Sequence, residues 1–246
     1  MSDDGIPDVS AVERAAVFDD APSSYRAEVQ RSIDFFGTDV DYFTAVKAQR
    51  LLAVIERELG APGAARVLDV GCGVGVTDAY LVGEVKELHG VDVAAACVAL
   101  AEQSVPGASF TAYDGNVLPF ETASFDVSFC INVLHHVEPD DWSAFMAELA
   151  RVVRPGGIVV TFEHNPLNPL TRRAVGRCPF DDSAVLLSRR RLRALHVEAG
   201  LDLRDASYIV FLPFGGARVD AVERALHRVP LGAQHYVASR KRTRSA

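Results

Sequence analysis

The fold of this 246-residue chain is decided by the stretch from Val67 to Gly75, which reads Val-Leu-Asp-Val-Gly-Cys-Gly-Val-Gly. Its apolar residues predict a short buried strand, because aliphatic and β-branched side chains fit a pleated surface. The three alternating glycines that follow permit positive φ and let the backbone come close to a ligand. Thr77 and Asp78 then begin a helical pattern. A strand, a tight turn and a helix start in this order predict a site for a nucleotide-like ligand.

Three further strand-like segments follow along the chain. Residues 90–93 form a second predicted strand ending in Asp92 and Val93, and an acid at this position typically accepts hydrogen bonds from ribose hydroxyls. Residues 110–116 predict a third strand that ends near an acid, and residues 125–131 predict a fourth. The glycine spacing is G-x-G-x-G, which differs from the G-x-G-x-x-G fingerprint of dinucleotide-binding proteins.

In their order and spacing these segments resemble class I S-adenosylmethionine-dependent methyltransferases of the small-molecule kind, similar to the methyltransferase type 11 family. The resemblance is close over roughly residues 45–165 and looser as far as Ala238. Its motifs are Val67–Gly75, Asp92, Asp114–Phe120, Phe125–Val137 and Leu149–Val160. A dehydrogenase would share the glycine turn and Asp92, but we would not expect it also to carry Asp69, Asp114 and the Leu-His-His stretch that begins at Leu134.

The resemblance implies an α/β fold with a doubly wound, mostly parallel seven-stranded sheet, which is the Rossmann-like methyltransferase fold. We expect an N-terminal helical cap in residues 1–60, of which residues 1–12 read as disordered. Residues 61–246 form the expected S-adenosylmethionine-binding domain, because strand and helix patterns alternate there. Residues 234–238 read as the last strand, which this family inserts antiparallel.

An irregular insert at about residues 163–187 interrupts the alternation. Two Asn-Pro pairs in it predict turns, since proline cannot continue regular structure. Ser188 reads as the N-cap of the next helix. We expect the segment Glu163 to Asp182 to form one wall of an acceptor cavity, with Arg172 or Arg173 available for an anionic group, because ligands bind beyond the carboxyl ends of parallel strands.

The resemblance implies that S-adenosylmethionine binds around the glycine turn. Asp69 would attract the cofactor's ammonium group, Asp92 would bind the ribose hydroxyls, and Asp114 would accept from the adenine amino group. Lys47, on the helix before the first strand, could pair with the cofactor carboxylate or be a solvated surface lysine. The full set of expected cofactor-binding residues is Tyr42, Lys47, Asp69, Gly71, Gly73, Asp92, Val93, Asp114, Gly115, Asn116 and Asn132.

Methyl transfer from a sulfonium needs alignment and a dry site more than acid–base chemistry. If the acceptor is a hydroxyl, a base helps to remove its proton, and imidazole is available as a neutral base near neutral pH. The candidates are His135, His136 and His164, which lie at or beyond the ends of predicted strands. We do not expect adjacent histidines to point the same way, so one of the pair should be packed or capping. These histidines modestly favour O-methylation over N- or C-methylation.

Charge is uneven along the chain. Residues 1–171 carry 10 Lys and Arg against 26 Asp and Glu, whereas residues 172–246 carry 15 against 7. Two basic clusters, at residues 189–193 and 240–244, could meet a nucleic acid or an anionic substrate. No aromatic residues are interleaved with them, however, and the net charge is −8. A solvated helix face and a terminal tail explain the clusters more simply.

The four cysteines are widely spaced, and neither Cys-x-x-Cys nor His-Glu-x-x-His occurs, so we expect no metal and no disulfide framework. We recognise no signal peptide and no membrane-spanning run, and therefore expect a cytoplasmic protein. The expected function is methylation of a small molecule, such as a secondary metabolite, sugar, isoprenoid or lipid. The alternatives are a nucleic-acid methyltransferase and a catalytically silent S-adenosylmethionine-binding protein, and a homodimer is left open.

Overall fold

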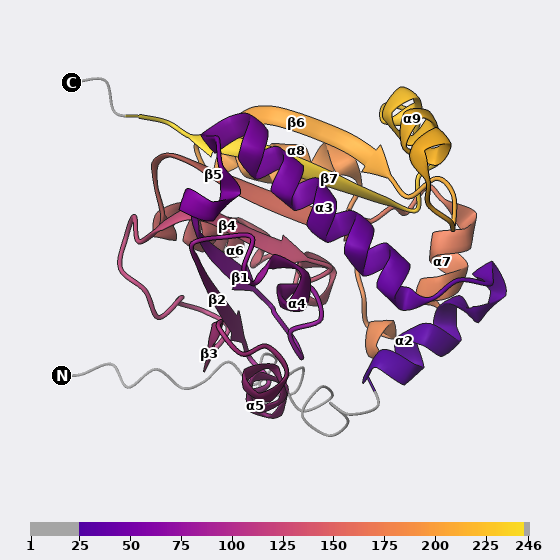
Figure 1. Ribbon diagram of the computed structural model, residues 1–246, viewed down its shortest axis with the longest axis horizontal. Coiled ribbons are helices and arrows are strands. Elements are labelled where there is room, and N and C mark those ends of the chain that lie inside the picture. Colours follow the sequence, from indigo (N-terminus) through magenta and orange to yellow (C-terminus); the bar gives the residue numbers. More distant parts are fainter. Residues whose placement is uncertain (1–24, 244–246) are drawn as a thin grey trace.

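The computed structural model describes residues 25–243, which form a seven-stranded sheet in the order β3-β2-β1-β4-β5-β7-β6 (Figure 1). Neighbouring strands from β3 to β5 are parallel, whereas β7 runs antiparallel to both β5 and β6. The strands are β1 Arg66–Val70, β2 Glu87–Asp92, β3 Ser109–Ala112, β4 Phe125–Ile131, β5 Val153–His164, β6 Leu201–Ile209 and β7 Gln234–Lys241. The mostly parallel sheet with an antiparallel last strand confirms the predicted fold class.

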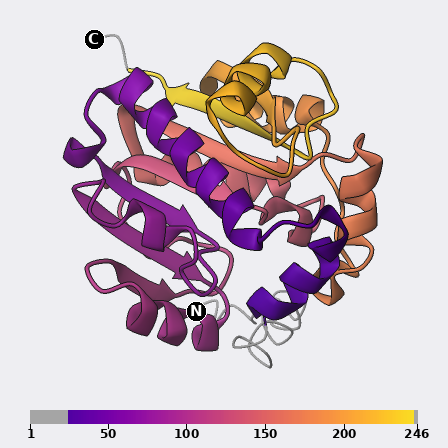
Figure 2. The same cartoon turned by 45° about the vertical axis from the view of Figure 1, so that its right-hand side comes forward.

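Helices cover both faces of this sheet, and Figure 2 shows α3 lying across one of them. The α-helices are α2 Tyr25–Ile33, α3 Val40–Leu59, α4 Asp78–Leu81, α5 Ala95–Ser104, α6 Trp142–Val152, α7 Pro169–Val175, α8 Arg189–Glu198 and α9 Ala217–Leu226. The 3-10 turns are η1 Asp34–Phe36, η2 Pro62–Ala64, η3 Leu134–His136 and η4 Pro179–Asp181. None of the helices between residues 25 and 243 has the length and apolarity that a membrane crossing requires.

Successive residues of a strand pack against helices on opposite faces of the sheet. Val67 of β1 packs on the face covered by α3, in a cluster with the fully buried Leu51 and Ile55. The next residue, Leu68, packs on the other face in a cluster with Met146 of α6. Because both faces are covered, the central strands read as continuous apolar runs, which is why the stretch beginning at Val67 was recognisable as a buried strand.

The carboxyl ends of the parallel strands meet at one edge of the sheet. β1 ends at Val70, immediately before the glycine turn. In the neighbouring pair, Ile131 at the end of β4 lies opposite Phe162 of β5. Asn132 and His164 therefore lie at the same edge as the glycine turn, although they are distant in sequence.

β5 is longer than the sequence predicts, because it continues through Glu163 and His164. These two residues pair with His235 and Gln234 of β7, which extends the ladder beyond the apolar run. The prediction that the irregular insert begins at Glu163 was therefore wrong. The insert begins after His164, and a strand from the far end of the chain sets this boundary.

The insert also contains helix α7, which the sequence analysis took for irregular structure. Asn168 is its N-cap, and its Oδ1 accepts hydrogen bonds from the N–H groups of Leu170 and Thr171. Pro169 occupies the first helical position, where its missing N–H costs nothing and its fixed φ suits a helix. The Asn-Pro pair was thus a helix start rather than a turn.

The segment that leads into β7 holds the start of α7 in place. Asn168 donates from Nδ2 to the carbonyl of Leu231 at 2.7 Å, and Thr171 donates from Oγ1 to the carbonyl of Ala233 at 2.8 Å. The N–H of Asn165 also donates to the Ala233 carbonyl at 3.0 Å. The insert is therefore fixed against the sheet by contacts across a long sequence separation.

The remaining predictions concern the cap of α8, the segment after β6 and the N-terminal part of the chain. Ser188 caps α8 as predicted, because its hydroxyl accepts a backbone N–H of the first turn. α9 was not predicted, and its buried Glu223 accepts the N–H of Val210 at 3.0 Å. The expected disorder of residues 1–12 lies outside the described residues. The domain boundary near residue 60 stays a prediction.

We predict that Gly157→Ala lowers the free energy of unfolding by about 1–3 kcal/mol, the usual cost of overpacking. A Cβ at this position of β5 would lie 2.5 Å from the carbonyl oxygen of Asp126 in the neighbouring segment. The control is Gly63→Ala, whose Cβ would meet only the Glu84 carbonyl, at 3.8 Å, and which should change stability by less than about 1 kcal/mol. Urea unfolding measures both variants. A Gly157→Ala protein as stable as the wild type would contradict the close approach of β4 and β5.

Candidate active site

A cavity of about 270 Å³ opens at the carboxyl ends of β1, β2 and β4. It brings together residues that the sequence analysis predicted from separate motifs. The predicted cofactor-binding residues that line it are Gly71, Gly73, Asp92, Val93, Gly115, Asn116 and Asn132. Their roles toward a cofactor stay predictions, but their convergence on one cavity follows from the strand order.

The glycine turn has the backbone that the sequence pattern predicted. Gly71 has φ +83°, and an added Cβ would lie 2.4 Å from a methyl group of Val133. Gly73 has φ +53°, and an added Cβ there would find no atom within 4 Å. Gly71 is thus required by packing, whereas Gly73 faces open space in which a ligand can approach the backbone.

Asp92 ends β2 and holds the glycine turn next to it. Its Oδ2 accepts the N–H of Gly73 at 2.8 Å, and its Oδ1 accepts the N–H of Ala94 at 2.9 Å. The carboxylate therefore fixes both the turn after β1 and the start of α5, while it also lines the cavity. A change at Asp92 affects the shape of the cavity as well as its charge.

Behind the glycine turn, Asp69 and Asp78 form a buried pair of acids. Asp69 is 3% exposed and Asp78 is fully buried. Burial and the charges of the nearby carboxylates raise the pKa of Asp69 well above its ordinary value, and burial raises the pKa of Asp78 to about 7. Asp69 Oδ1 has no hydrogen-bond partner among the described residues. Neither acid lines the cavity, so the expected attraction of the cofactor's ammonium group by Asp69 stays a prediction.

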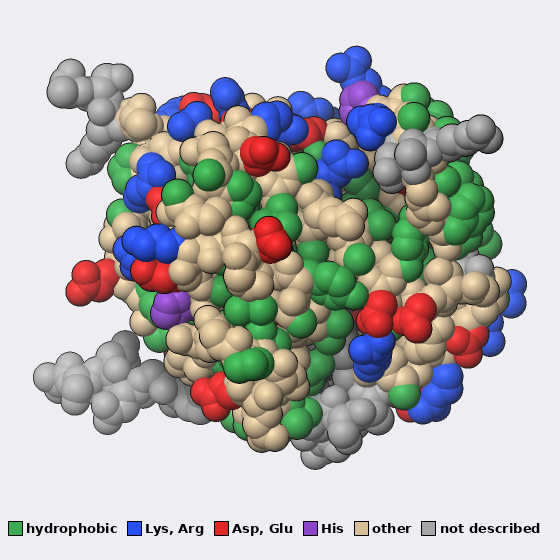
Figure 3. All heavy atoms as spheres, viewed as in Figure 1, with side chains coloured by type: hydrophobic (Ala, Val, Ile, Leu, Met, Phe, Trp, Pro, Cys, Tyr) green, Lys and Arg blue, Asp and Glu red, His purple; other side chains and the backbone are tan. Residues whose placement is uncertain are grey.

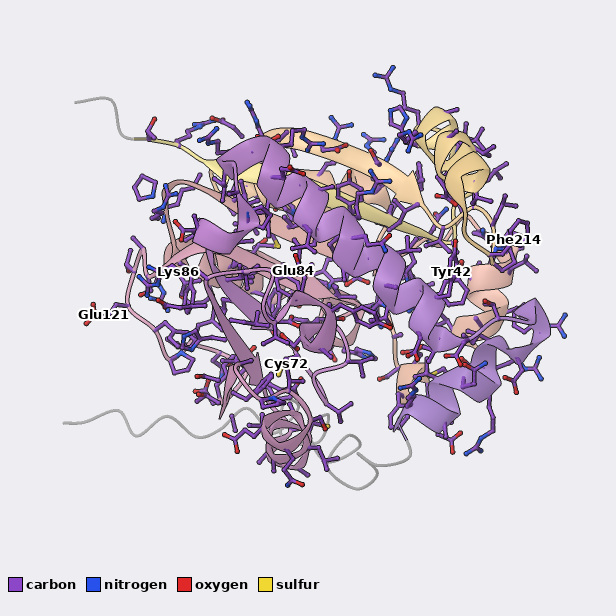
Figure 4. The ribbon with its side chains drawn as sticks, viewed as in Figure 1. Tyr42, Cys72, Glu84, Lys86, Glu121 and Phe214 are labelled. Atoms are coloured by element: carbon purple, nitrogen blue, oxygen red, sulfur yellow. The ribbon has the colours of Figure 1, made fainter. Side chains whose placement is uncertain are left out.

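Two predicted cofactor-binding residues point elsewhere in the structure. Asp114 does not line the large cavity, and its Oδ1 accepts the N–H groups of Asn116 at 2.9 Å and Val117 at 3.2 Å. It shapes the loop that brings Asn116 to the cavity. The Tyr42 hydroxyl donates to the carbonyl of Phe214 at 2.9 Å, and the two residues lie near each other in Figure 4. Tyr42 lines neither cavity.

A second cavity, of about 110 Å³, lies next to the first and is walled by α2, α3, α7 and η4. Its lining is largely apolar, with Phe43 and Phe180 among its members, and the insert contributes part of it. Lys47 also lines it and is 7% exposed, so it is not a solvated surface lysine. Burial lowers the pKa of Lys47 to about 8, against the opposing charges of Glu163 and Asp69.

The arginines of the insert do not reach either cavity. Neither Arg172 nor Arg173 lines them, and the guanidinium of Arg173 lies 5.0 Å from the ring centre of Phe35. This is a cation–π contact between α7 and the η1 turn. The expected use of Arg172 or Arg173 for an anionic group therefore finds no support in their positions.

Asn132 and His136 line both cavities. Asn132 follows β4 and has φ +57°, a left-handed conformation that asparagine tolerates better than most residues. Its Oδ1 is buried without a hydrogen-bond partner among the described residues. A buried polar atom without a partner costs free energy, so this position is prepared for a ligand that donates a hydrogen bond.

The three candidate histidines form one cluster with two acids. His135 Nδ1 lies 2.6 Å from Glu163 Oε2, and the rings of His135 and His164 are 5.1 Å apart. The Nε2 atoms of His135 and His136 each lie 3.5 Å from Asp181 Oδ1. The expectation that the adjacent histidines diverge was wrong, because the tight η3 turn brings their rings within 4.1 Å.

Burial and the neighbouring charges shift the pKa values of the three histidines in different directions. Burial would lower the pKa of His135, but Glu163 and Asp181 outweigh it and raise that pKa to about 9. Burial, reinforced by the His135 charge, lowers the pKa of His164 to about 4 and that of His136 to about 3. At neutral pH, His135 therefore carries a proton while His164 and His136 are neutral.

Sequence reasoning missed the two acids as site residues. Glu163 had a usable signal, because a charged residue at the end of the apolar run of β5 must be compensated if that run is buried. Asp181 had no such sequence signal, because it follows Pro179 in a short turn without any periodic pattern. Gln234 lines the second cavity only because β7 pairs with the end of β5.

Comparison with known proteins agrees with this geometry. Residues 68–161 match the model of a family described as a methyltransferase domain. The phthiotriol/phenolphthiotriol dimycocerosates methyltransferase 1 of Mycobacterium ulcerans is 36% identical over 112 residues, which are 43% of this chain and 40% of that protein. The demethylmenaquinone methyltransferase of Beutenbergia cavernae is 35% identical over 105 residues, 43% of each chain. Both matches span less than half of the relative.

The fold has solved counterparts over nearly its full length. The crystal structure of magnesium protoporphyrin IX methyltransferase from Synechocystis with bound S-adenosylmethionine has a TM-score of 0.63 and 15% identity. The similarity covers 98% of this chain and 100% of that one. The fold is therefore that of class I S-adenosylmethionine-dependent methyltransferases, and residues 68–161 match a methyltransferase domain.

We predict that Asp92→Ala weakens the binding of S-adenosylhomocysteine by roughly 1.5–3 kcal/mol, the usual loss for a charged hydrogen-bond partner. Asp126→Ala is the control, because Asp126 accepts the N–H of Arg66 at 2.8 Å at the opposite edge of the sheet. It should lose stability without losing affinity. Calorimetric titration measures both, and unchanged affinity in Asp92→Ala would contradict its place in the cofactor site.

We predict that His135 stabilises the fold by about 3 kcal/mol at low pH and much less at high pH. Its pKa is raised to about 9 in the folded protein, so the stabilisation is complete below the unfolded value near 6.5 and is lost as pH rises through 9. The difference in unfolding free energy between wild type and His135→Gln should therefore shrink between pH 6 and pH 10. The measurement uses urea unfolding with EDTA present, because imidazoles collect trace metal. A constant difference would contradict the predicted shift, and His227→Gln, at an exposed site, is the control.

Proposed function

We propose that this protein transfers a methyl group from S-adenosylmethionine to an oxygen of an apolar small molecule. The observation that carries the proposal is the pair of cavities that share Asn132 and His136. A methyl transferase must hold donor and acceptor on either side of one narrow junction, because the reaction is an in-line displacement. The larger cavity would take the donor and the smaller one the acceptor.

The residues of the larger cavity fit S-adenosylmethionine. Gly73 leaves open space above the turn, where a ligand can approach the backbone. Asp92 has the position and charge to accept from ribose hydroxyls. The unpartnered Oδ1 of Asn132 would accept a hydrogen bond from the methionine part of the cofactor. When bound, S-adenosylmethionine supplies a methyl group already activated by the sulfonium charge.

The smaller cavity suits an apolar acceptor with one polar end. Phe43 and Phe180 contribute apolar walls, while His164, Lys47 and Gln234 add polar groups to the lining. The relatives named above are, by their names, methyltransferases of phthiotriol or phenolphthiotriol dimycocerosates and of demethylmenaquinone. An isoprenoid, lipid or other apolar metabolite therefore fits this cavity better than a sugar. A buried cavity also excludes water, which keeps the donor from hydrolysis.

His164 is the best placed residue to receive the proton of an acceptor hydroxyl. It lines the smaller cavity and is neutral at neutral pH, because burial and the His135 charge lower its pKa to about 4. His135 is protonated at the same pH and would orient the acceptor rather than remove its proton. A weak base is sufficient here, because the leaving group needs no protonation and alignment contributes most of the rate.

The described basic residues give no support to nucleic-acid methylation. Arg191 pairs with Glu198 at 2.9 Å and Arg242 pairs with Asp202 at 2.8 Å. On the face shown in Figure 3, basic and acidic side chains of the described residues alternate and form no continuous basic stripe. Binding of a phosphate backbone would call for such a stripe.

We predict that His164→Ala lowers kcat by on the order of 10²-fold and leaves the affinity for S-adenosylhomocysteine nearly intact. The assay uses methyl-labelled S-adenosylmethionine with a panel of apolar hydroxylated acceptors, including hydroquinones, and identifies the methylated atom in the product. His227→Ala is the control, because His227 is bonded to the Arg224 carbonyl and lines neither cavity.

Three outcomes would count against parts of the proposal. A labelled product with the methyl group on nitrogen or carbon would contradict O-methylation. Full activity in His164→Ala, with loss in His136→Ala, would move the proton acceptor to the turn after β4. If the cofactor binds and no acceptor in the panel or in fractionated cell extract is methylated, the protein is a silent cofactor-binding protein.

A further inference from the structure

Three metal-ligating side chains converge beside the junction of the two cavities. His135 and His136 come from η3, and Asp181 comes from η4, which the insert carries to the same point. Their ligand atoms all lie within 4.8 Å of one another. Two imidazoles and one carboxylate are a donor set that divalent transition metals bind with several geometries.

The separations between the three groups are long for hydrogen bonds and match those between ligands of one metal ion. Asp181 Oδ1 lies 3.5 Å from His135 Nε2 and 3.5 Å from His136 Nε2. A strong hydrogen bond between nitrogen and oxygen is about 2.7–3.2 Å long. Two ligand atoms held at about 2.1 Å from one tetrahedral metal ion are roughly 3.4 Å apart. The observed spacing therefore leaves room for an ion between the three groups.

The ring of His135 is oriented as a metal-binding histidine is. Its Nδ1 lies 2.6 Å from Glu163 Oε2, and Glu163 Oε1 accepts the N–H of Leu134 at 2.8 Å. Glu163 is fully buried and cannot turn away. A carboxylate on the far nitrogen fixes the ring and the tautomer and makes the near nitrogen a better ligand. His135 Nε2 thus faces Asp181, and a bound ion would displace the proton that the His135 ring carries in the metal-free protein.

We propose that His135 Nε2, His136 Nε2 and Asp181 Oδ1 together bind one divalent transition-metal ion of the Zn²⁺ or Fe²⁺ type. Mg²⁺ and Ca²⁺ are poor candidates, because they prefer a shell made of oxygen atoms. Three protein ligands leave at least one position of the ion open. All three residues line the smaller cavity, so the open position faces its interior.

An ion at this place would bind an oxygen of the acceptor and hold it near the junction. This second part of the inference rests on the proposed function, whereas the metal site itself does not. An acceptor with two neighbouring oxygens, such as a catechol or an enediol, would use two open positions at once. Lewis-acid contact would also make the acceptor hydroxyl easier to deprotonate by the neutral His164.

The test is a metal titration of the full chain after removal of bound ions with EDTA. Calorimetry with Zn²⁺ against a competing chelator gives the stoichiometry and affinity, and the visible spectrum of the Co²⁺ form reports nitrogen and oxygen coordination. We expect one ion per chain. Asp181→Asn should weaken binding at least 100-fold, and Glu163→Gln should weaken it 10- to 100-fold by releasing the His135 ring.

Asp182→Asn is the matched control, because it removes the same charge at the adjacent, exposed residue. It should bind the ion within about 2-fold of the wild type, since it supplies no ligand. S-adenosylhomocysteine binding reports the fold of each variant. Should Asp181→Asn fail this check, His136→Gln takes its place, because His136 is partly exposed and tolerates the change better.

No bound ion in the wild type, or equal affinity in wild type and Asp181→Asn, would overturn the metal site. Binding of S-adenosylhomocysteine without binding of Zn²⁺ would leave the proposed function standing and remove only the metal. Binding of one Zn²⁺ by a protein that methylates no acceptor would leave the metal site standing and remove the proposed function. If the affinity for the acceptor is the same with and without the ion, the ion does not bind the acceptor oxygen at its open position.

Discussion

The carboxylate of Glu163 is completely buried, and the acceptor side of the structure is arranged around its charge. One oxygen accepts a backbone N–H from Leu134 and the other faces His135 Nδ1, while the buried Lys47 adds a positive charge nearby. An uncompensated buried charge would cost several kcal/mol, so these groups cannot move independently. The end of β5 and the η3 turn are therefore joined by one side chain, and both contribute residues to the smaller cavity.

The positions of the two cavities follow from the parallel arrangement of the strands. Ligands meet at the carboxyl edge, where the glycine turn after β1 and Asp92 after β2 shape the larger cavity. Asn132 directly follows β4, has a left-handed backbone conformation and lines both cavities. Such conformations cost free energy and persist where the surroundings impose them. Here the N–H of Asn132 donates to the carbonyl of Phe162 in β5 at 2.9 Å, which ties the residue to the neighbouring strand.

The sequence predicts those parts of the fold and site that are encoded locally. The buried strand before Gly71, the acid at the end of β2 and the cap at Ser188 each have a short, physically interpretable signal, and the structure has them where expected. The contact between His136 and Asp181 has no such signal, because the chain must fold back through the insert to make it. The same holds for the extension of β5, since the residues that pair with it belong to the last strand. A contact between residues that are distant in the sequence produces no periodic pattern in the sequence around either residue.

The position of β7 has a consequence for the order in which the protein can mature on the ribosome. β5 lies inside the sheet, yet its second neighbour is synthesised only after β6 and α9 have emerged. Until then the nascent chain exposes one edge of β5, a site open to mispairing. Ala233 and Gln234 line the smaller cavity, and the carbonyls of Leu231 and Ala233 anchor α7, so this cavity is incomplete until the last strand docks. The larger cavity is lined entirely by residues before β5, so the two cavities depend on parts of the chain that are synthesised at different times.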